Sequence, residues 1–512
     1  MNYGDPRQAR TFPQLVRAAA VAHGDAVAIT LTGPTLPDAA ASFVELERRS
    51  AVLARGLVAR GVGKGGRIGF LYGNGPDFAV TLAAIARIGA VAIPLSTLLK
   101  AGELVRVLCQ SDLTGLIVQR SLLGHDYAAR LAEALPGLAQ SSPDLRLPAA
   151  PYLRWIVSTG ADLTSAIRDL TWLTDAADSV SEDLLLAIES EVHPTDQMIK
   201  IYTSGAMALP KGVKHDHGPV LFRTHWLREK VQFQPGQMVK ASLPMFWIGG
   251  LMMTLLPAWE AGATTVCTER TSSSSRMAMG TVLAADDLAL MPRNVIDWAL
   301  GMTETLGPYS WGDELRAAGY PLCAPLDHIS DNFELRVVDA NDRPLGEGGR
   351  GEIQVRGYGL TPALHKVERA DNFSADGYYR TGDRGLVEGV RIHFTGRDGD
   401  MIKTASANVS PAEVEAEMQA LAGVHSAYVV GLPDEARGQK VVAAVVARDG
   451  VVLDFAAIEA ALRARLSGYK VPQAYVAITR EEVPMLPSNK VARRQIERIV
   501  AARLGFGAQA PI

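Results

Sequence analysis

Helical and extended patterns alternate along the first hundred residues of this chain, and this alternation limits the fold more than any other feature. Apolar residues recur at helical spacing over residues 42–62 and stop at Gly63, as in an amphipathic helix with a glycine at its end. The sequence RIGFLYGN then predicts a strand, residues 77–88 a second helix, and the apolar residues 90–95 a second strand. Because helices that alternate with strands usually connect parallel strands, we expect an α/β body.

Two later regions follow other patterns. Residues 333–357 contain two β-rich runs joined by Asn, Asp, Pro and Gly, which predicts antiparallel strands. Beyond residue 397 the pattern predicts a helix over 411–421, strands over 427–432 and 441–447, and a helix over 456–466. Glycines near residues 396–400 would let the backbone pivot. We therefore predict a large amino-terminal body of several subdomains, with mixed sheets and a β-rich part (1–397), and a small α+β carboxy-terminal lid (398–512).

Charge and cysteine content exclude several functional classes. The 51 Lys and Arg residues and the 55 Asp and Glu residues are interspersed and give a net charge of −4, so the basic patch needed for nucleic-acid binding is absent from the sequence. The cysteines lack the spacing of a zinc site or a disulfide framework: Cys109, Cys267 and Cys323. The amino terminus lacks the apolar core of a signal peptide, and the apolar residues 79–95 are interrupted by Arg87 and Pro94. We expect a cytoplasmic protein without a membrane span.

Residues 202–212, YTSGAMALPKG, carry the strongest local signal for chemistry. Small residues, a glycine and a lysine after an apolar strand suit a loop whose backbone amides and ammonium group approach phosphate. This is not a Walker loop, because Lys211 follows Pro210 and precedes Gly212. By itself, the segment fits a plain surface turn equally well.

The same segment resembles the phosphate loop of the adenylate-forming superfamily, which includes acyl-CoA synthetases, luciferases and peptide-synthetase adenylation domains. Further motifs of that superfamily follow in its order: LPMF and GGL at 243–251, GMTET at 301–305, YRTGD at 379–383, GRDGDMIK with VSPAEVE at 396–415, and PSNK at 487–490. They cover nearly the whole chain. The chain is identified as a member of this superfamily, and it is most similar to the acyl-CoA synthetases.

This resemblance implies a reaction. A fatty or other small-molecule carboxylic acid reacts with ATP to give an acyl adenylate and pyrophosphate, and the acyl group then forms a thioester with coenzyme A. ATP, Mg²⁺ and coenzyme A are the implied cofactors, and a homodimer is an assembly that the resemblance allows. Two alternatives stay open: transfer to an amine or a carrier-protein thiol, and a degenerate relative that binds nucleotide or acyl ligand without efficient catalysis.

The resemblance also implies roles for single residues. The nucleotide would be bound by Thr203, Ser204, Gly205, Lys211, Thr303, Asp383 and Arg397, and Mg²⁺ by Glu304 and Thr203. The chemistry is suitable, because carboxylates accept ribose hydroxyls, hard oxygens bind Mg²⁺ and a guanidinium pairs with phosphate. Read alone, Asp383 is also typical of a turn, Glu304 of a solvated surface and Arg397 of a salt bridge.

Two lysines are assigned to the two half-reactions. Lys490 would stabilise the negative charge that shifts during adenylate formation, and Lys403 would serve thioester formation after the lid has turned about a hinge at Gly399. The acyl substrate is assigned to Phe246, Trp247, Gly249 and Gly301, although an aromatic pair beside Gly-Gly-Leu fits a core equally well.

The sequence departs from the superfamily pattern at several positions. Ala206, Met207 and Ala208 replace hydroxyl residues and a glycine in the phosphate loop, and Leu300 replaces an aromatic residue that would lie against adenine. The spacing between Gly205 and Gly301, 301 − 205 = 96 positions, is short for the family. His215 and His217 have a spacing that occurs in metal sites, but packing or hydrogen bonding is the preferred interpretation.

Overall fold

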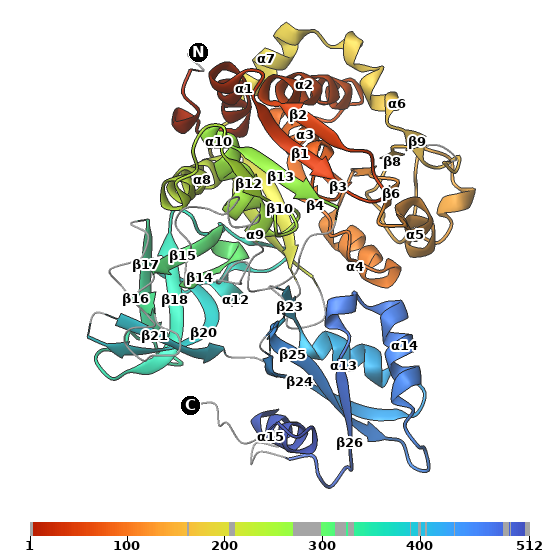
Figure 1. Ribbon diagram of the computed structural model, residues 1–512, viewed down its shortest axis with the longest axis vertical. Helices are drawn as coiled ribbons and strands as arrows, with labels where there is room; N and C mark the ends of the chain where they lie inside the picture. Colours follow the sequence, from red (N-terminus) through yellow and green to blue (C-terminus); the bar gives the residue numbers. More distant parts are fainter. Residues whose placement is uncertain are drawn as a thin grey trace.

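The computed structural model describes most of the chain, namely residues 4–160, 163–203, 210–269, 298–312, 324–325, 332–389, 391–397, 401–404, 407–434, 436–484, 491 and 493–506. Figure 1 shows the arrangement of its elements. Among these described residues, no helix combines the length and the apolar character needed to cross a membrane.

An eight-stranded sheet forms the centre of the amino-terminal body. Its strands run in the order β19 (Leu364–His365), β11 (Lys211–Asp216), β10 (Gln197–Thr203), β4 (Val91–Pro94), β3 (Arg67–Leu71), β5 (Gly115–Val118), β8 (Trp155–Ser158) and β9 (Arg168–Asp169). The strands from β10 to β9 pair in parallel, whereas β11 pairs antiparallel with β10 and with β19. The predicted parallel α/β arrangement is therefore confirmed.

Of the helices between these strands, the two predicted ones, α2 (Phe43–Ala59) and α3 (Pro76–Arg87), begin and end close to the predicted positions. Helix α2 starts with a capping box, in which the Glu45 N–H donates to Ser42 Oγ and Glu45 Oε2 accepts from the Ser42 N–H. It is followed by α3, α4 (Ala101–Ser111), α5 (Tyr127–Ala134), α6 (Thr171–Thr174) and α7 (Glu182–Ser190). Apolar faces of α2 and α3 pack into one core with residues of β3 and β10.

A second sheet of the body joins the start of the chain to its middle. Its four strands are ordered β12 (Met238–Lys240), β13 (Thr264–Thr268), β1 (Val27–Thr32) and β2 (Ala39–Ser42). Around it lie α1 (Phe12–His23), α8 (His217–Val231), α9 (Ile248–Gly250), the π-helical turn η4 (Leu251–Leu255) and α10 (Leu256–Ala261). Side chains of α1, η4 and α10 share the same core as α2 and α3.

The β-rich part forms an antiparallel sheet of its own. Its order is β16 (Ala324–Pro325), β21 (Arg391–Arg397), β20 (Tyr379–Glu388), β18 (Arg350–Gly357) and β17 (Phe333–Val338), and the hairpin β14 (Trp298–Met302) and β15 (Gly307–Gly312) lies beside it. The predicted antiparallel pair over residues 333–357 is β17 with β18. Leu300, expected beside adenine from its motif position, is buried with Val213, Tyr309 and Phe333 in the core of this part.

The carboxy-terminal elements build the last sheet. Its strands are β23 (Ala407–Val409), β22 (Ile402–Thr404), β25 (Gly438–Ala447) and β24 (Val424–Asp434), with β26 (Ala474–Ile478) parallel to β25. Helices α13 (Pro411–Gln419) and α14 (Phe455–Arg465) pack on one face and α15 (Arg493–Arg503) on the other, as Figure 1 shows. This agrees with the predicted α+β lid. The boundary at 397/398 stays a prediction, since residues 398–400 lie outside the described residues.

Candidate active site

A cavity of about 460 Å³ lies between the amino-terminal body and the carboxy-terminal elements. Its body side includes the predicted residues Thr203, Phe246, Trp247, Gly249, Gly301 and Thr303. Its carboxy-terminal side includes Lys403, Ala407, Asn408, Glu413, Arg437, Gly438, Tyr469 and Lys470. Residues separated by about two hundred positions thus face one space, and several sequence-predicted site residues meet there.

The predicted phosphate loop starts and ends at a single point of the large sheet. Thr203 is the last residue of β10, Lys211 is the first residue of β11, and the two are direct partners in the antiparallel ladder. Thr203 and Pro210 both line the cavity, so both ends of the loop are at its edge. Ser204 and Gly205, together with the substituted residues 206–208, lie outside the described residues.

The Gly-Met-Thr-Glu motif forms a tight turn between β14 and β15. The His215 Nε2–H donates to the Thr303 carbonyl at 2.8 Å, and the Thr361 N–H donates to the Glu304 carbonyl at 2.7 Å. A side chain at Gly301 would collide with backbone, since a Cβ there would lie 2.4 Å from the Gly307 oxygen. Two hydrogen bonds from other segments therefore hold the turn, and only glycine fits at its start.

Burial keeps both histidines of the 215–217 segment neutral. It lowers the pKa of His215 to about 4 and that of His217 to about 3. His217 Nδ1 accepts a hydrogen bond from the Phe12 N–H at 3.1 Å. The hydrogen-bonding interpretation of both residues is confirmed.

Glu304 contacts a residue that sequence reasoning did not single out. The Tyr379 hydroxyl donates to Glu304 Oε1 at 3.0 Å. Tyr379 is the first residue of the YRTGD motif, so two motifs that are distant in sequence meet through one hydrogen bond. The available signal was the place of Tyr379 in that motif, but nothing in the sequence indicated its partner.

Asp383 and Arg397 are neighbours on adjacent strands. They are direct partners in the antiparallel pair of β20 and β21, and Asp383 is buried, with its N–H donating to Thr381 Oγ1 at 3.0 Å. Lys211, Glu304 and Asp383 are described residues that are not part of the cavity lining. Lys490 and Gly399 lie outside the described residues.

Aromatic side chains form one wall of the cavity. Phe246 is buried in the core of the body and also lines the cavity, so the two interpretations of this residue are compatible. Its ring packs edge-on against Trp247 at 5.7 Å between centroids, and Trp247 contacts Tyr469 of the carboxy-terminal part at 6.2 Å in the same manner.

Lys403 approaches the cavity from β22. Its side chain is exposed, its ammonium lies 5.9 Å from the centre of the Phe394 ring, and its N–H donates to Gln439 Oε1 at 2.8 Å. Lys403 is thus the predicted catalytic lysine that the described part of the chain brings to the cavity.

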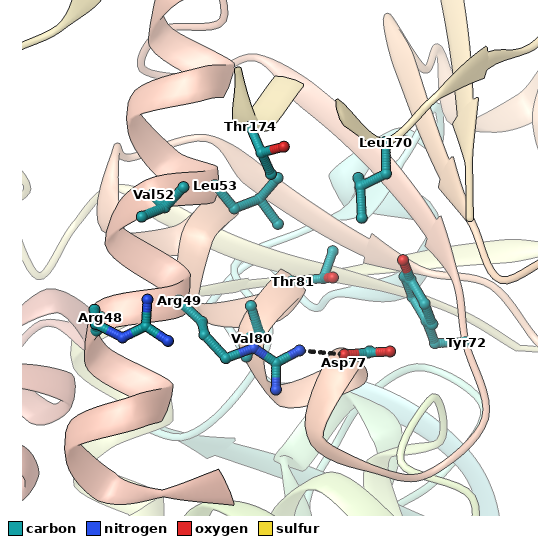
Figure 2. A pocket seen from close by; sticks show the side chains of 10 residues that line it. All are labelled: Arg48, Arg49, Val52, Leu53, Tyr72, Asp77, Val80, Thr81, Leu170 and Thr174. Carbon is teal, nitrogen blue, oxygen red and sulfur yellow. Dashed lines mark hydrogen bonds and ion pairs between the residues drawn. The ribbon is translucent and has the colours of Figure 1, made fainter. Parts of the chain in front are cut away.

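A smaller cavity of about 190 Å³ lies between α2 and α3 (Figure 2). Arg49 and Asp77 form an ion pair of 2.5 Å at its edge, and Tyr72 and Leu170 point toward it. Its lining includes none of the residues that the motifs predict, so the larger cavity is the candidate active site.

Comparisons with known proteins agree with this site. The chain matches the family model of the AMP-binding enzyme over residues 16–293 and that of the AMP-binding enzyme C-terminal domain over residues 413–490. It is 28% identical to a feruloyl-CoA synthase from an Amycolatopsis species, over 96% of this chain and 97% of that protein.

Solved structures show the same fold. O-succinylbenzoate CoA synthetase from Bacillus subtilis superposes with a TM-score of 0.70 at 18% identity, over 96% of this chain and 98% of that one. An amide bond synthetase from Marinactinospora thermotolerans superposes with a TM-score of 0.73 at 20% identity, over 96% and 99%. Since the family model covers more than half of the 512 residues, the chain belongs to the family of AMP-binding, adenylate-forming enzymes.

Proposed function

We propose that this protein is an AMP-forming ligase that joins a carboxylic acid to coenzyme A through an acyl adenylate. The observation that carries the proposal is the cavity itself, in which Thr203, Thr303 and Phe246 of the body face Lys403 of the carboxy-terminal part. The same cavity is thus lined by motif residues assigned to the nucleotide, to the acyl group and to the thioester-forming step. We further propose that residues 398–512 act as the mobile lid.

In the first step a carboxylate oxygen attacks the α-phosphorus of ATP, and the bond to pyrophosphate breaks. Backbone amides of the loop from Thr203 through Ser204 and Gly205, with Lys211, would hold the phosphates, and Asp383 and Arg397 the ribose. Glu304 and Thr203 offer the hard oxygens that suit Mg²⁺, and the Tyr379 hydroxyl orients the Glu304 carboxylate. Bound Mg²⁺ would supply positive charge near the phosphates. Lys490 would stabilise the charge that moves onto the α-phosphate.

In the second step the coenzyme A thiol gives up its proton to solvent, its sulfur attacks the carbonyl carbon of the adenylate, and AMP leaves with the bonding electrons. Lys403 is the lysine assigned to this step, and its position on the cavity supports the view that the structure has the thioester-forming arrangement. Positioning and charge stabilisation would provide most of the rate, without a covalent enzyme intermediate.

A different acceptor is the second candidate. The fold of an amide bond synthetase extends over 96% of this chain, so the same architecture accommodates chemistry with an acceptor other than coenzyme A. Transfer to an amine or a carrier-protein thiol would keep the adenylation step and change the acceptor that reaches the adenylate from the lid side.

The test is acid-dependent exchange of labelled pyrophosphate into ATP, measured with short, medium, long and aromatic carboxylic acids. An acid that supports exchange is then supplied with coenzyme A, or with amines, and the product is identified. If none of the acids supports exchange although the protein binds ATP, the binding-protein alternative is favoured.

The altered phosphate loop predicts a slow ligase that can be improved. Hydrogen bonds to charged groups contribute roughly 1.5 to 3 kcal/mol each, and two hydroxyl donors are missing at residues 206–208. Changing Ala206→Ser, Met207→Thr and Ala208→Gly together is expected to raise the turnover of pyrophosphate exchange by about tenfold or more, with little change in apparent affinity for the acid. An inert triple variant would contradict this account of the loop.

A further inference from the structure

Helix α4 of the body makes a buried polar connection to the carboxy-terminal part. Glu103 Oε1 lies 2.6 Å from Lys470 Nζ, and Glu103 Oε2 accepts from the Ser467 N–H at 2.9 Å and from Ser467 Oγ–H at 2.7 Å. Lys470 also pairs with Glu413 at 2.9 Å, within the carboxy-terminal part. The Ser467 hydroxyl also lies 2.9 Å from the Leu98 carbonyl oxygen, so Glu103 and the Leu98 backbone are the body's contributions to a network whose other members lie more than three hundred residues later.

This network is almost closed to water. Glu103 and Lys470 each expose 4% of their surface, and Glu413 exposes 8%. Burial lowers the pKa of the Lys470 ammonium, but Tyr469, Glu103 and Glu413 together raise it above its ordinary value, so the ammonium stays charged. A charge this deeply buried is favourable only while its partners remain in place.

The network depends on one arrangement of lid and body. Glu103, Glu413 and Lys470 border the same cavity as Lys403, so the ion pair forms where Lys403 faces the site. The nearby Arg106–Glu417 pair of 2.5 Å and the Trp247–Tyr469 contact join the same two parts but are more exposed. If the lid turned away, Glu103 would lose Ser467 and Lys470 together.

The far end of α4 is fixed to the strand that leads into the phosphate loop. Carbonyl groups at its carboxyl end accept hydrogen bonds from Tyr202 at 3.2 Å, from Lys200 at 3.4 Å and from Arg67 at 2.8 Å. At its start, Glu103 Oε2 also accepts the Lys100 N–H at 2.9 Å. Hydrogen bonds therefore join helix α4 to the loop strand β10 at one end and to the carboxy-terminal part at the other.

We propose that Glu103 is a positioning residue for the second half-reaction, because its bonds to Ser467 and Lys470 hold the lid in the orientation that presents Lys403 to the cavity. This role rests on the proposed function, since it assigns the orientation seen here to thioester formation. Glu103 would act through Lys403 and would not touch the reacting atoms.

Glu103→Gln tests this role by keeping the shape of the side chain and removing its charge. We expect the conversion of a supplied acyl adenylate to thioester to slow by roughly tenfold or more, while pyrophosphate exchange is unchanged or faster. Ser467→Ala, which removes the hydroxyl contacts to Glu103 and to the Leu98 carbonyl without leaving a charge unpaired, is expected to give a smaller loss in the same direction.

Glu189→Gln is the matched control. Glu189 also exposes 4% of its surface and pairs with Arg87 at 2.5 Å, but the pair lies within the body. If lost stability alone caused the effect, this control would share it. A thioester-specific loss in Glu189→Gln, or an equal loss of both half-reactions in Glu103→Gln and Ser467→Ala, would overturn the role.

Hydrogen exchange gives a readout that needs no activity. Peptides covering residues 98–104 and 466–471 are expected to exchange faster in Glu103→Gln and Ser467→Ala than in the unchanged protein, and at the same rate in Glu189→Gln. Unchanged exchange rates of these peptides in both variants would overturn the proposed latch, meaning the bonds from Glu103 that hold the lid. This holds even if the protein uses another acceptor. Absence of adenylation in the unchanged protein would instead count against the proposed function, and the exchange result would still decide whether the latch exists.

Discussion

Lys490→Ala is expected to abolish adenylate formation and to leave the conversion of a supplied acyl adenylate to thioester nearly intact. An ammonium group that approaches the α-phosphate would stabilise charge only in the first transition state, and removal of one such group costs roughly a hundredfold to a thousandfold in rate. The first half-reaction is measured by pyrophosphate exchange, and the second by single-turnover thioester formation.

A charge control separates this role from a general effect of lost positive charge. Arg463→Ala removes an exposed cation from α14 that pairs only along its own helix, with Glu459 at 2.6 Å among the contacts described. It is expected to leave both half-reactions unchanged. Equal loss of both half-reactions in Lys490→Ala would show that the lysine has been assigned the wrong step.

Lys403→Ala is expected to have the opposite effect to Lys490→Ala on the two half-reactions. Its side chain reaches the cavity from β22, so its loss is expected to slow thioester formation by about a hundredfold while pyrophosphate exchange continues. The same two assays measure this, with acyl adenylate that accumulates on the enzyme as a third sign. Undiminished thioester formation would remove Lys403 from the mechanism and would leave the cavity's lid side without its assigned catalytic group.

Local patterns predicted much of the fold, because they depend on neighbours in sequence. Helix α2, the strands on either side of α3, and the antiparallel pair β17 and β18 all follow from spacing or turn residues. The candidate site residues were predicted in a different way, from motifs that occur in the same order as in the superfamily. Thr203, Phe246 and Lys403 line one cavity, and their roles remain proposals.

Contacts between distant segments could not be predicted from the sequence. Glu103 was an ordinary helical glutamate and Lys470 one lysine before a Val-Pro pair, and only the folded chain brings them to 2.6 Å. The hydrogen bond from Tyr379 to Glu304 and the burial of Leu300 have the same origin. Periodicity reports which face of an element is buried, but it carries no information on the partner across that face.

The pairing of Thr203 with Lys211 has a consequence for protein engineering. Because one rung of the sheet ladder holds both ends, we expect replacement of the residues between them to leave β10 and β11 in place. Loop-closure entropy rises only slowly with loop length, so we expect the same of a segment that is one or two residues longer. Loops from other members of the family can therefore be transplanted here, and differences in turnover among such chimaeras would report the chemistry of the loop alone.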